Sequence, residues 1–216
     1  MKKKLRIAIA AAFVVSVSIA SAQFTATMPP QTGTFNGSTR GYWFTAPVAF
    51  QMVGVSVLPQ TGSTTTLQNF AVVRFDGNVP PPVFSTTTNA FTQLAVGFDL
   101  AADVFQPVSV TVNAGDVIGV YGNRVSAVGA TTGQNSYGSG AVGTSIFGNA
   151  VTLNRSGMQF HLGLATSPGG MHDLWSEPTS VNITRVEFQY TAVPEPATMA
   201  VLGLGALALL RRRRKS

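Results

Sequence analysis

Apolar and polar residues alternate with a period of two in several short windows of the central sequence, and this alternation restricts the fold more than any other feature. In residues 108–112, three valines alternate with Ser109 and Thr111. The same period recurs in four other windows: residues 92–98, 117–121, 158–164 and 185–190. No long window has the 3.6-residue period of an amphipathic helix. Because successive side chains of a strand point to opposite faces, the pattern predicts an all-β fold of roughly nine or ten strands.

Two details add to this prediction. Residues 70–75 are apolar on both faces, which is typical of a central strand that is covered on both sides. The apolar phase slips between Met52 and Val53, which predicts a β-bulge. Residues 23–193 contain 20 Gly, 10 Pro and 23 Thr but no Lys, a composition that favours strands and turns. We therefore expect residues 23–192 to form one β-sandwich or jelly-roll domain.

The positive charge of the chain is confined to its two ends. The formal net charge is +6, but residues 23–193 contain five Arg, no Lys and seven acidic residues, a net charge of −2. A nucleic-acid partner would require basic residues on the folded part, so DNA and RNA binding are excluded. The chain has no cysteine, which excludes disulfides, thiolate metal sites and cysteine nucleophiles.

The first 22 residues have the pattern of a secretory signal peptide. A cationic start, residues 2–6, precedes the apolar run 7–15, and small residues at Ala20 and Ala22 precede Gln23. Nine strictly apolar residues are too few to span a bilayer, which takes about 20. We expect a signal helix, Sec-type export and cleavage by signal peptidase before Gln23. The alternative, a buried helix of the domain, does not account for the flanking residues.

A second uncharged segment, the fourteen residues 197–210, lies near the C-terminus. As an α-helix it is about 21 Å long, against roughly 30 Å of hydrocarbon in a bilayer. It predicts a short transmembrane helix that serves as a transient anchor. An ordinary membrane anchor is the alternative. The helix is followed by a basic membrane stop: Arg211, Arg212, Arg213, Arg214 and Lys215. The positive-inside rule keeps both cationic ends in the cytoplasm and places residues 23–192 outside it.

The tail combines a Pro-Glu-Pro motif (Pro194, Glu195 and Pro196), a short apolar helix and a terminal basic run. In this order it resembles the PEP-CTERM sorting signal, over residues 193–216 only. The resemblance implies export from a Gram-negative bacterium, recognition by an exosortase of the inner membrane, and cleavage at or near the motif. Such tails accompany exopolysaccharide and biofilm production, and related tails occur on some ice-binding proteins. The implied destination is the cell surface or the extracellular space.

The central sequence offers little for catalysis. His161 alternates with apolar neighbours on an expected strand and therefore faces solvent, and His172 adjoins Asp173. A His–Asp pair could belong to a hydrolytic triad, but no Gly-x-Ser-x-Gly elbow supplies a nucleophile. Neither histidine has a second histidine at metal-binding spacing. We expect no catalytic residues and no cofactor.

Calcium is the one metal that the sequence leaves open. Asp99, Asp103 and Asp116 border expected strand ends, where carboxylates and backbone carbonyl groups can hold Ca²⁺. No EF-hand loop or nonapeptide calcium repeat is present. The sequence therefore assigns no metal site.

Three aromatic residues are candidates for carbohydrate contact. Trp43 lies on the strand face opposite Tyr42 and Phe44, Trp175 is expected in a loop, and Tyr137 lies in a glycine-rich stretch. Aromatic faces with polar neighbours are a usual means of binding sugars. The alternative for Trp43 is packing in a second layer of the sandwich.

Three classes of function remain. The first is a non-enzymatic surface or matrix protein that contacts exopolysaccharide. The second is a secreted hydrolase or lyase acting on polysaccharide, which the scarcity of acids and histidines disfavours. The third is an ice-binding surface, but the threonines in 64–66 and 86–88 are consecutive and cannot share one strand face. We expect the first class.

Overall fold

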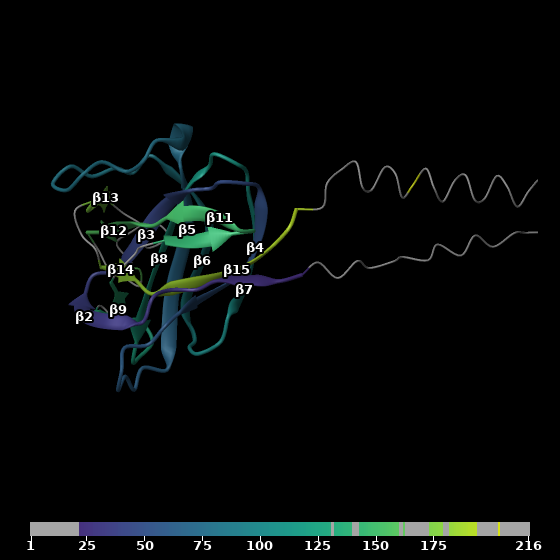
Figure 1. Ribbon diagram of the computed structural model, residues 1–216. Coiled ribbons are helices and arrows are strands. Elements are labelled where there is room, and N and C mark those ends of the chain that lie inside the picture. The colour runs from purple at the N-terminus through teal and green to yellow at the C-terminus, as the bar shows by residue number, and fades with distance from the viewer. Residues whose placement is uncertain are drawn as a thin grey trace, which may run out of the picture.

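Strands dominate the computed structural model, which describes residues 22–130, 132–139, 143–159, 162, 173–178, 182–193 and 203 (Figure 1). The elements are, in chain order, β1 (Phe24–Ala26), β2 (Gln31–Gly37), β3 (Arg40–Thr45), β4 (Phe50–Val57), β5 (Leu67–Phe75), the 3₁₀ turn η1 (Asp76–Asn78), β6 (Phe91–Ala101), β7 (Gln106–Val112), β8 (Val117–Val125), β9 (Gly133–Gly138), β10 (Gly143–Ile146), β11 (Asn149–Thr152), β12 (Asn154–Met158), β13 (Leu174–Ser176), β14 (Ile183–Thr184) and β15 (Val186–Thr191). The described part thus has more strands than predicted, because five of them have four residues or fewer and are too short to show alternation.

Most of the predicted processing segments lie outside the described residues. Of the expected signal-peptide cleavage residues, Ala22 and Gln23 are described, and both are exposed. The remaining positions lie outside: Ala20, Pro194, Glu195, Pro196 and the basic run 211–215, together with residues 1–21 of the expected signal peptide and the expected C-terminal helix apart from Gly203. Within the described part, no helix combines the length and the apolar character needed to cross a bilayer.

The strands form antiparallel sheets, which confirms the all-β prediction. A four-stranded sheet has the order β1–β15–β4–β7. A nine-stranded sheet contains the path β13–β12–β3–β8–β5–β6, and β9 extends it from β8 and pairs in turn with β2 and β14. This extension gives the large sheet the shape of a curled half-barrel, and β10 and β11 form a separate hairpin.

The two large sheets share one apolar core. Phe44 of the nine-stranded sheet stacks on Phe188 of the four-stranded sheet, with 5.8 Å between ring centroids, and Phe50 stacks on the same ring at 5.9 Å. All three side chains are fully buried. Burying one such side chain stabilises a fold by roughly 1.5–3 kcal/mol, so this core holds the sheets face to face.

Strand β5 is covered on both sides, as predicted for residues 70–75. Phe70 and Val72 belong to the shared core, whereas Ala71 and Val73 belong to a second cluster on the opposite face of the nine-stranded sheet. The period of two in a strand sends alternate side chains to the two faces. Both faces of β5 are therefore apolar because both are buried.

The predicted bulge and the predicted alternation are also confirmed. The register of β4 with β7 shifts between Met52, opposite Val110, and Gly54, opposite Pro107. In β7, Val110 is buried whereas its neighbour Thr111 is exposed. The register of β4 with β15 shifts at the same place, since the adjacent residues Gln189 and Tyr190 face Gly54 and Met52. Relative to β15, Val53 is therefore an extra residue in β4, which explains why the apolar phase slips there.

The described ends of the folded part lie side by side. Phe24 of β1 pairs with Tyr190 of β15, and their rings stack with centroids 5.7 Å apart. Gln23 precedes β1 directly, and Val193 lies two residues beyond β15. In Figure 1 both ends leave the same side of the molecule, whereas β2, β9, β12, β13 and β14 occupy the other side. The curled part of the large sheet is therefore remote from the chain ends.

Candidate functional site

The three aromatic residues selected from the sequence do not form one exposed surface. Trp175 was expected in a loop and Tyr137 in a glycine-rich stretch, both exposed, but they lie in β13 and β9 and expose only 6% and 5% of their surface. The prediction of their exposure is wrong because Arg155 lies over the Tyr137 ring, and Arg40 and Phe84 lie against the Trp175 ring. Trp43 is half-buried in β3, and its Nε1 donates a 2.9 Å hydrogen bond to Ser176 Oγ.

Trp43 and Trp175 face opposite sides of the nine-stranded sheet. Arg40 and Trp43 are three positions apart in β3, so their side chains point to opposite faces. Trp175 is in register with Gly157, which pairs with Arg40. The ring of Trp175 accordingly packs on Arg40, whereas Trp43 packs against the second apolar cluster.

The side chains around Arg40 form a mixed group that we call the arginine–aromatic cluster. Its members are Phe35, Arg40, Tyr137, Arg155, Trp175 and Glu177. The guanidinium carbon of Arg40 lies 4.5 Å from the ring centroid of Phe35 and 5.5 Å from that of Trp175. Both distances are within the range of cation–π interactions. Rings from β2 and β13 therefore flank a cation from β3.

The second arginine of the cluster has a carboxylate partner. Arg155 Nε lies 2.8 Å from Glu177 Oε2, and the guanidinium carbon of Arg155 lies 4.7 Å from the Tyr137 ring centroid. Burial raises the pKa of Tyr137, so its hydroxyl stays protonated at neutral pH. Burial also lowers the pKa of Arg40, opposed by Tyr137 and Glu177, but an arginine remains charged at neutral pH.

The position of Trp175 depends on a glycine beneath it. A Cβ added at Gly157 would lie 2.7 Å from the nearest indole atom of Trp175 and 3.3 Å from Cδ of Arg40. The indole can therefore lie against β12 only because residue 157 has no side chain. Glycine in a strand often marks such a close approach.

The sequence alone identified only two members of the cluster. Phe35, Arg40, Arg155 and Glu177 were missed. The scarcity of arginine was a signal for these positions. Only five arginines occur in the central sequence, and each must be solvated or paired. Nothing in the sequence indicates that Arg40 and Arg155 lie together, because this depends on the pairing of β3 with β12.

The structure does not gather the candidate calcium ligands. Asp103 forms an ion pair with Arg124, Asp116 Oδ2 accepts a hydrogen bond from the backbone N–H of Asn113, and Asp99 Oδ2 accepts one from a glycine N–H. Among the described residues, no three His, Cys, Asp or Glu side chains form a group suited to a metal ion.

The histidines cannot be placed, because His161 and His172 lie outside the described residues. Asp173, the neighbour of His172, is described. Its backbone N–H donates to Asn89 Oδ1, and Asn89 Nδ2 donates to Asp173 Oδ1, each at 2.8 Å. Asp173 thus links the start of β13 to the segment before β6.

Residues 192–215 match the family model of the PEP-CTERM protein-sorting motif. The chain carries this sorting motif. The match confirms the interpretation of the tail, and the motif marks an exosortase substrate that is exported and sorted to the cell surface. The PEP-CTERM motif starts directly after Thr191, the last residue of β15. It covers the tail and not the folded part.

The other comparisons do not indicate a function. No curated protein matches the chain. Two solved structures, of the Gx and Gt strains of infectious bursal disease virus, contain chains that align with 91% and 90% of this chain. Their sequence identities to it are 12% and 11%, and the TM-scores are 0.22 and 0.20. The aligned part spans 47% and 46% of those viral chains, or about half their length.

Proposed function

We propose that this chain is a non-enzymatic protein of the cell surface or extracellular matrix that is delivered by its PEP-CTERM motif and contacts exopolysaccharide. The observation that carries the proposal is the sorting motif immediately after β15. Pro196 is five residues beyond Thr191, so an extended chain places the Pro-Glu-Pro motif within about 18 Å of the last strand. An exosortase that binds the motif therefore works close to the folded part.

The arrangement of the chain ends supports the expected topology. Phe24 and Tyr190 pair across β1 and β15, so the segments leading to both predicted membrane-inserting runs leave the fold at one place. A signal peptide and a C-terminal helix can then enter one membrane without unfolding the sheet. We extend the proposal to a single β-sandwich domain over residues 23–192, because residues of both large sheets form one core.

The non-enzymatic part of the proposal is supported by how buried polar groups are used. The hydroxyl of Ser156 donates to the carbonyl oxygen of Trp175 at 2.6 Å and lies 2.6 Å from the hydroxyl of Tyr121. Tyr121 itself is fully buried, and burial raises its pKa far above the usual range. These groups stabilise the sheet and are not available as nucleophile or base.

The sorting step is tested by replacing Pro194, Glu195 and Pro196 with alanine in cells that export the chain. We expect an unprocessed precursor in the inner-membrane fraction, detected by fractionation and mass spectrometry. Thr191→Ala, the last residue of β15 and outside the matched residues 192–215, serves as the control and should be processed normally. Unchanged release of the triple variant would contradict the proposal.

The contact with polysaccharide is tested with the full chain and the exopolysaccharide of the producing cells. We expect the protein to sediment with the polysaccharide and the length of the polysaccharide to stay unchanged. Appearance of new reducing ends or of unsaturated sugars would instead identify a hydrolase or a lyase. Trp43 stays a candidate contact on the second face of the sheet.

A further inference from the structure

The charges within the arginine–aromatic cluster do not balance. The cluster holds two guanidinium groups, Arg40 and Arg155, and one carboxylate, Glu177. Both oxygens of Glu177 are engaged, Oε2 by Arg155 Nε at 2.8 Å and Oε1 by Trp175 Nε1 at 3.1 Å. Within the described part of the chain, no carboxylate lies within ion-pair distance of Arg40. The cluster therefore carries one positive charge that its own groups do not neutralise.

Arg40 contacts neutral groups directly, and the carboxylate of Glu177 attracts it only from beyond ion-pair distance. Its Nη1 donates to the carbonyl oxygens of Thr39 and Met158 at 3.1 Å and 3.3 Å, and the rings of Phe35 and Trp175 flank it. Carbonyl oxygens and ring faces attract a cation without cancelling its charge. Its Nε is buried and has no hydrogen-bond partner among the described residues. No group outside the chain can reach this buried Nε, so an external anion pairs with the part of the half-buried Arg40 side chain that solvent reaches.

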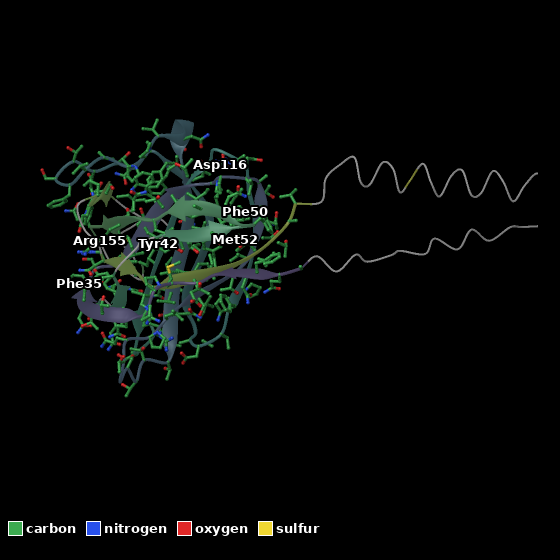
Figure 2. The ribbon with its side chains drawn as sticks, in the orientation of Figure 1. Phe35, Tyr42, Phe50, Met52, Asp116 and Arg155 are labelled. Atoms are coloured by element: carbon green, nitrogen blue, oxygen red, sulfur yellow. The ribbon has the colours of Figure 1, made fainter. Side chains whose placement is uncertain are left out.

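The cluster is accessible and lies at the far end of the fold. Phe35, Arg40, Arg155 and Glu177 are all half-buried, so solvent reaches part of each side chain. Figure 2 shows Phe35 and Arg155 on the side of the molecule opposite the described chain ends. A fold that is tethered at its chain ends thus presents this cluster away from the membrane.

We propose that the arginine–aromatic cluster binds a carboxylate-bearing sugar of an acidic polysaccharide. The carboxylate of the sugar pairs with the Arg40 guanidinium and is also attracted by the nearby positive charge of Arg155. The half-buried ring of Phe35 packs against the apolar face of the sugar. Guanidinium groups match carboxylates in shape and charge, and an aromatic ring suits the C–H face of a sugar. A neutral sugar leaves the charge of Arg40 unmatched. The inference rests on the proposed function and specifies the class of polysaccharide.

The experiment measures binding of the full chain, in mild detergent, to three soluble polymers of similar length. These are sodium polygalacturonate, its methyl ester and dextran. We expect polygalacturonate to bind at least about tenfold more tightly than the other two, since esterification removes the negative charge and leaves the sugar ring unchanged. Arg40→Gln should weaken that binding about tenfold. Arg74→Gln is the matched control, because Arg74 is also half-buried but lies outside the cluster, 3.9 Å from Asp116. The affinity of the Arg74→Gln chain for polygalacturonate should equal that of the wild type.

The cationic ends of the chain, residues 2–6 and 211–215, attract any polyanion, and the variants separate this effect from the cluster. If the wild type, Arg40→Gln and Arg155→Gln bind polygalacturonate with the same affinity, the binding is due to the cationic chain ends. That result overturns the inference. Should Arg40→Gln fail to fold, as judged by circular dichroism, Arg155→Gln and the ester comparison decide the matter.

The results also separate the inference from the proposed function. Equal affinity for polygalacturonate, its ester and dextran overturns the acidic-sugar site but keeps the contact with polysaccharide. Absence of binding to all three polymers overturns the acidic-sugar site, while processing of the Pro-Glu-Pro motif still tests sorting independently.

Discussion

Arg124 and Asp103 form a two-armed ion pair although they differ greatly in burial. Arg124 Nη1 and Nη2 lie 2.9 Å and 3.2 Å from the two carboxylate oxygens of Asp103. The side chain of Arg124 is 2% exposed, whereas that of Asp103 is 67% exposed. Arg124 also donates to the carbonyl oxygens of Val57 and Thr65. One buried cation therefore joins the loop after β4 to the loop before β7.

Removing Arg124 should cost much more stability than removing the charge of Asp103. Arg124→Met leaves the buried carbonyl oxygens of Val57 and Thr65 without these donors, and we expect a loss of about 3 kcal/mol in the free energy of unfolding. Asp103→Asn should cost less than about 1 kcal/mol, because exposed ion pairs contribute little. Urea unfolding of the full chain measures both. Similar losses for both variants would show that the ion pair, not the carbonyl contacts, stabilises the loops.

Acid should weaken the fold partly through Asp103. Its hydrogen bond from Arg124 holds the pKa of Asp103 below the usual value. The folded state therefore favours the ionised form, and this stabilisation is complete above the pKa of the unfolded chain and is lost as the pH falls through the lowered value. We expect the free energy of unfolding to fall less steeply between about pH 5 and pH 2 in Asp103→Asn than in the wild type. Identical pH profiles would contradict this role.

Gly157→Ala should destabilise the fold by roughly 1–3 kcal/mol, because the added methyl group meets the Trp175 ring at 2.7 Å. Gly33→Ala is the matched control in β2, where the nearest atom is Cβ of Tyr137 at 3.9 Å. Thermal unfolding of the full chain, followed by circular dichroism, compares the two variants with the wild type. An unchanged midpoint for Gly157→Ala would show that the indole moves aside freely.

Trp43→Ala should affect folding and not the binding of acidic sugar. Trp43 packs against the second apolar cluster and points away from the face that carries Arg40. We expect a loss of about 3 kcal/mol in the free energy of unfolding and an affinity for polygalacturonate within about twofold of the wild type. A folded Trp43→Ala chain that no longer binds the polymer would place the sugar contact on the second face.

Much of the fold could be predicted locally. Alternation in β7, the apolar faces of β5 and the bulge near Met52 all depend on the period of side chains along one strand. Strands of two to four residues, such as β13 and β14, were not predictable, because so few residues show no period. For the same reason Trp175 was assigned to a loop and expected to be exposed.

The sequence by itself determined the sorting tail, the all-β class and the charge-poor character of the folded part, because each follows from residues that are close together in the chain. Only the tertiary structure decided which side chains share a site. Arg40 and Arg155 meet through the pairing of β3 with β12, and Trp175 reaches Arg40 across Gly157. Strand pairing brings distant residues together through backbone hydrogen bonds, and every non-proline residue supplies the same backbone groups. The identity of the partners is therefore set by the whole fold.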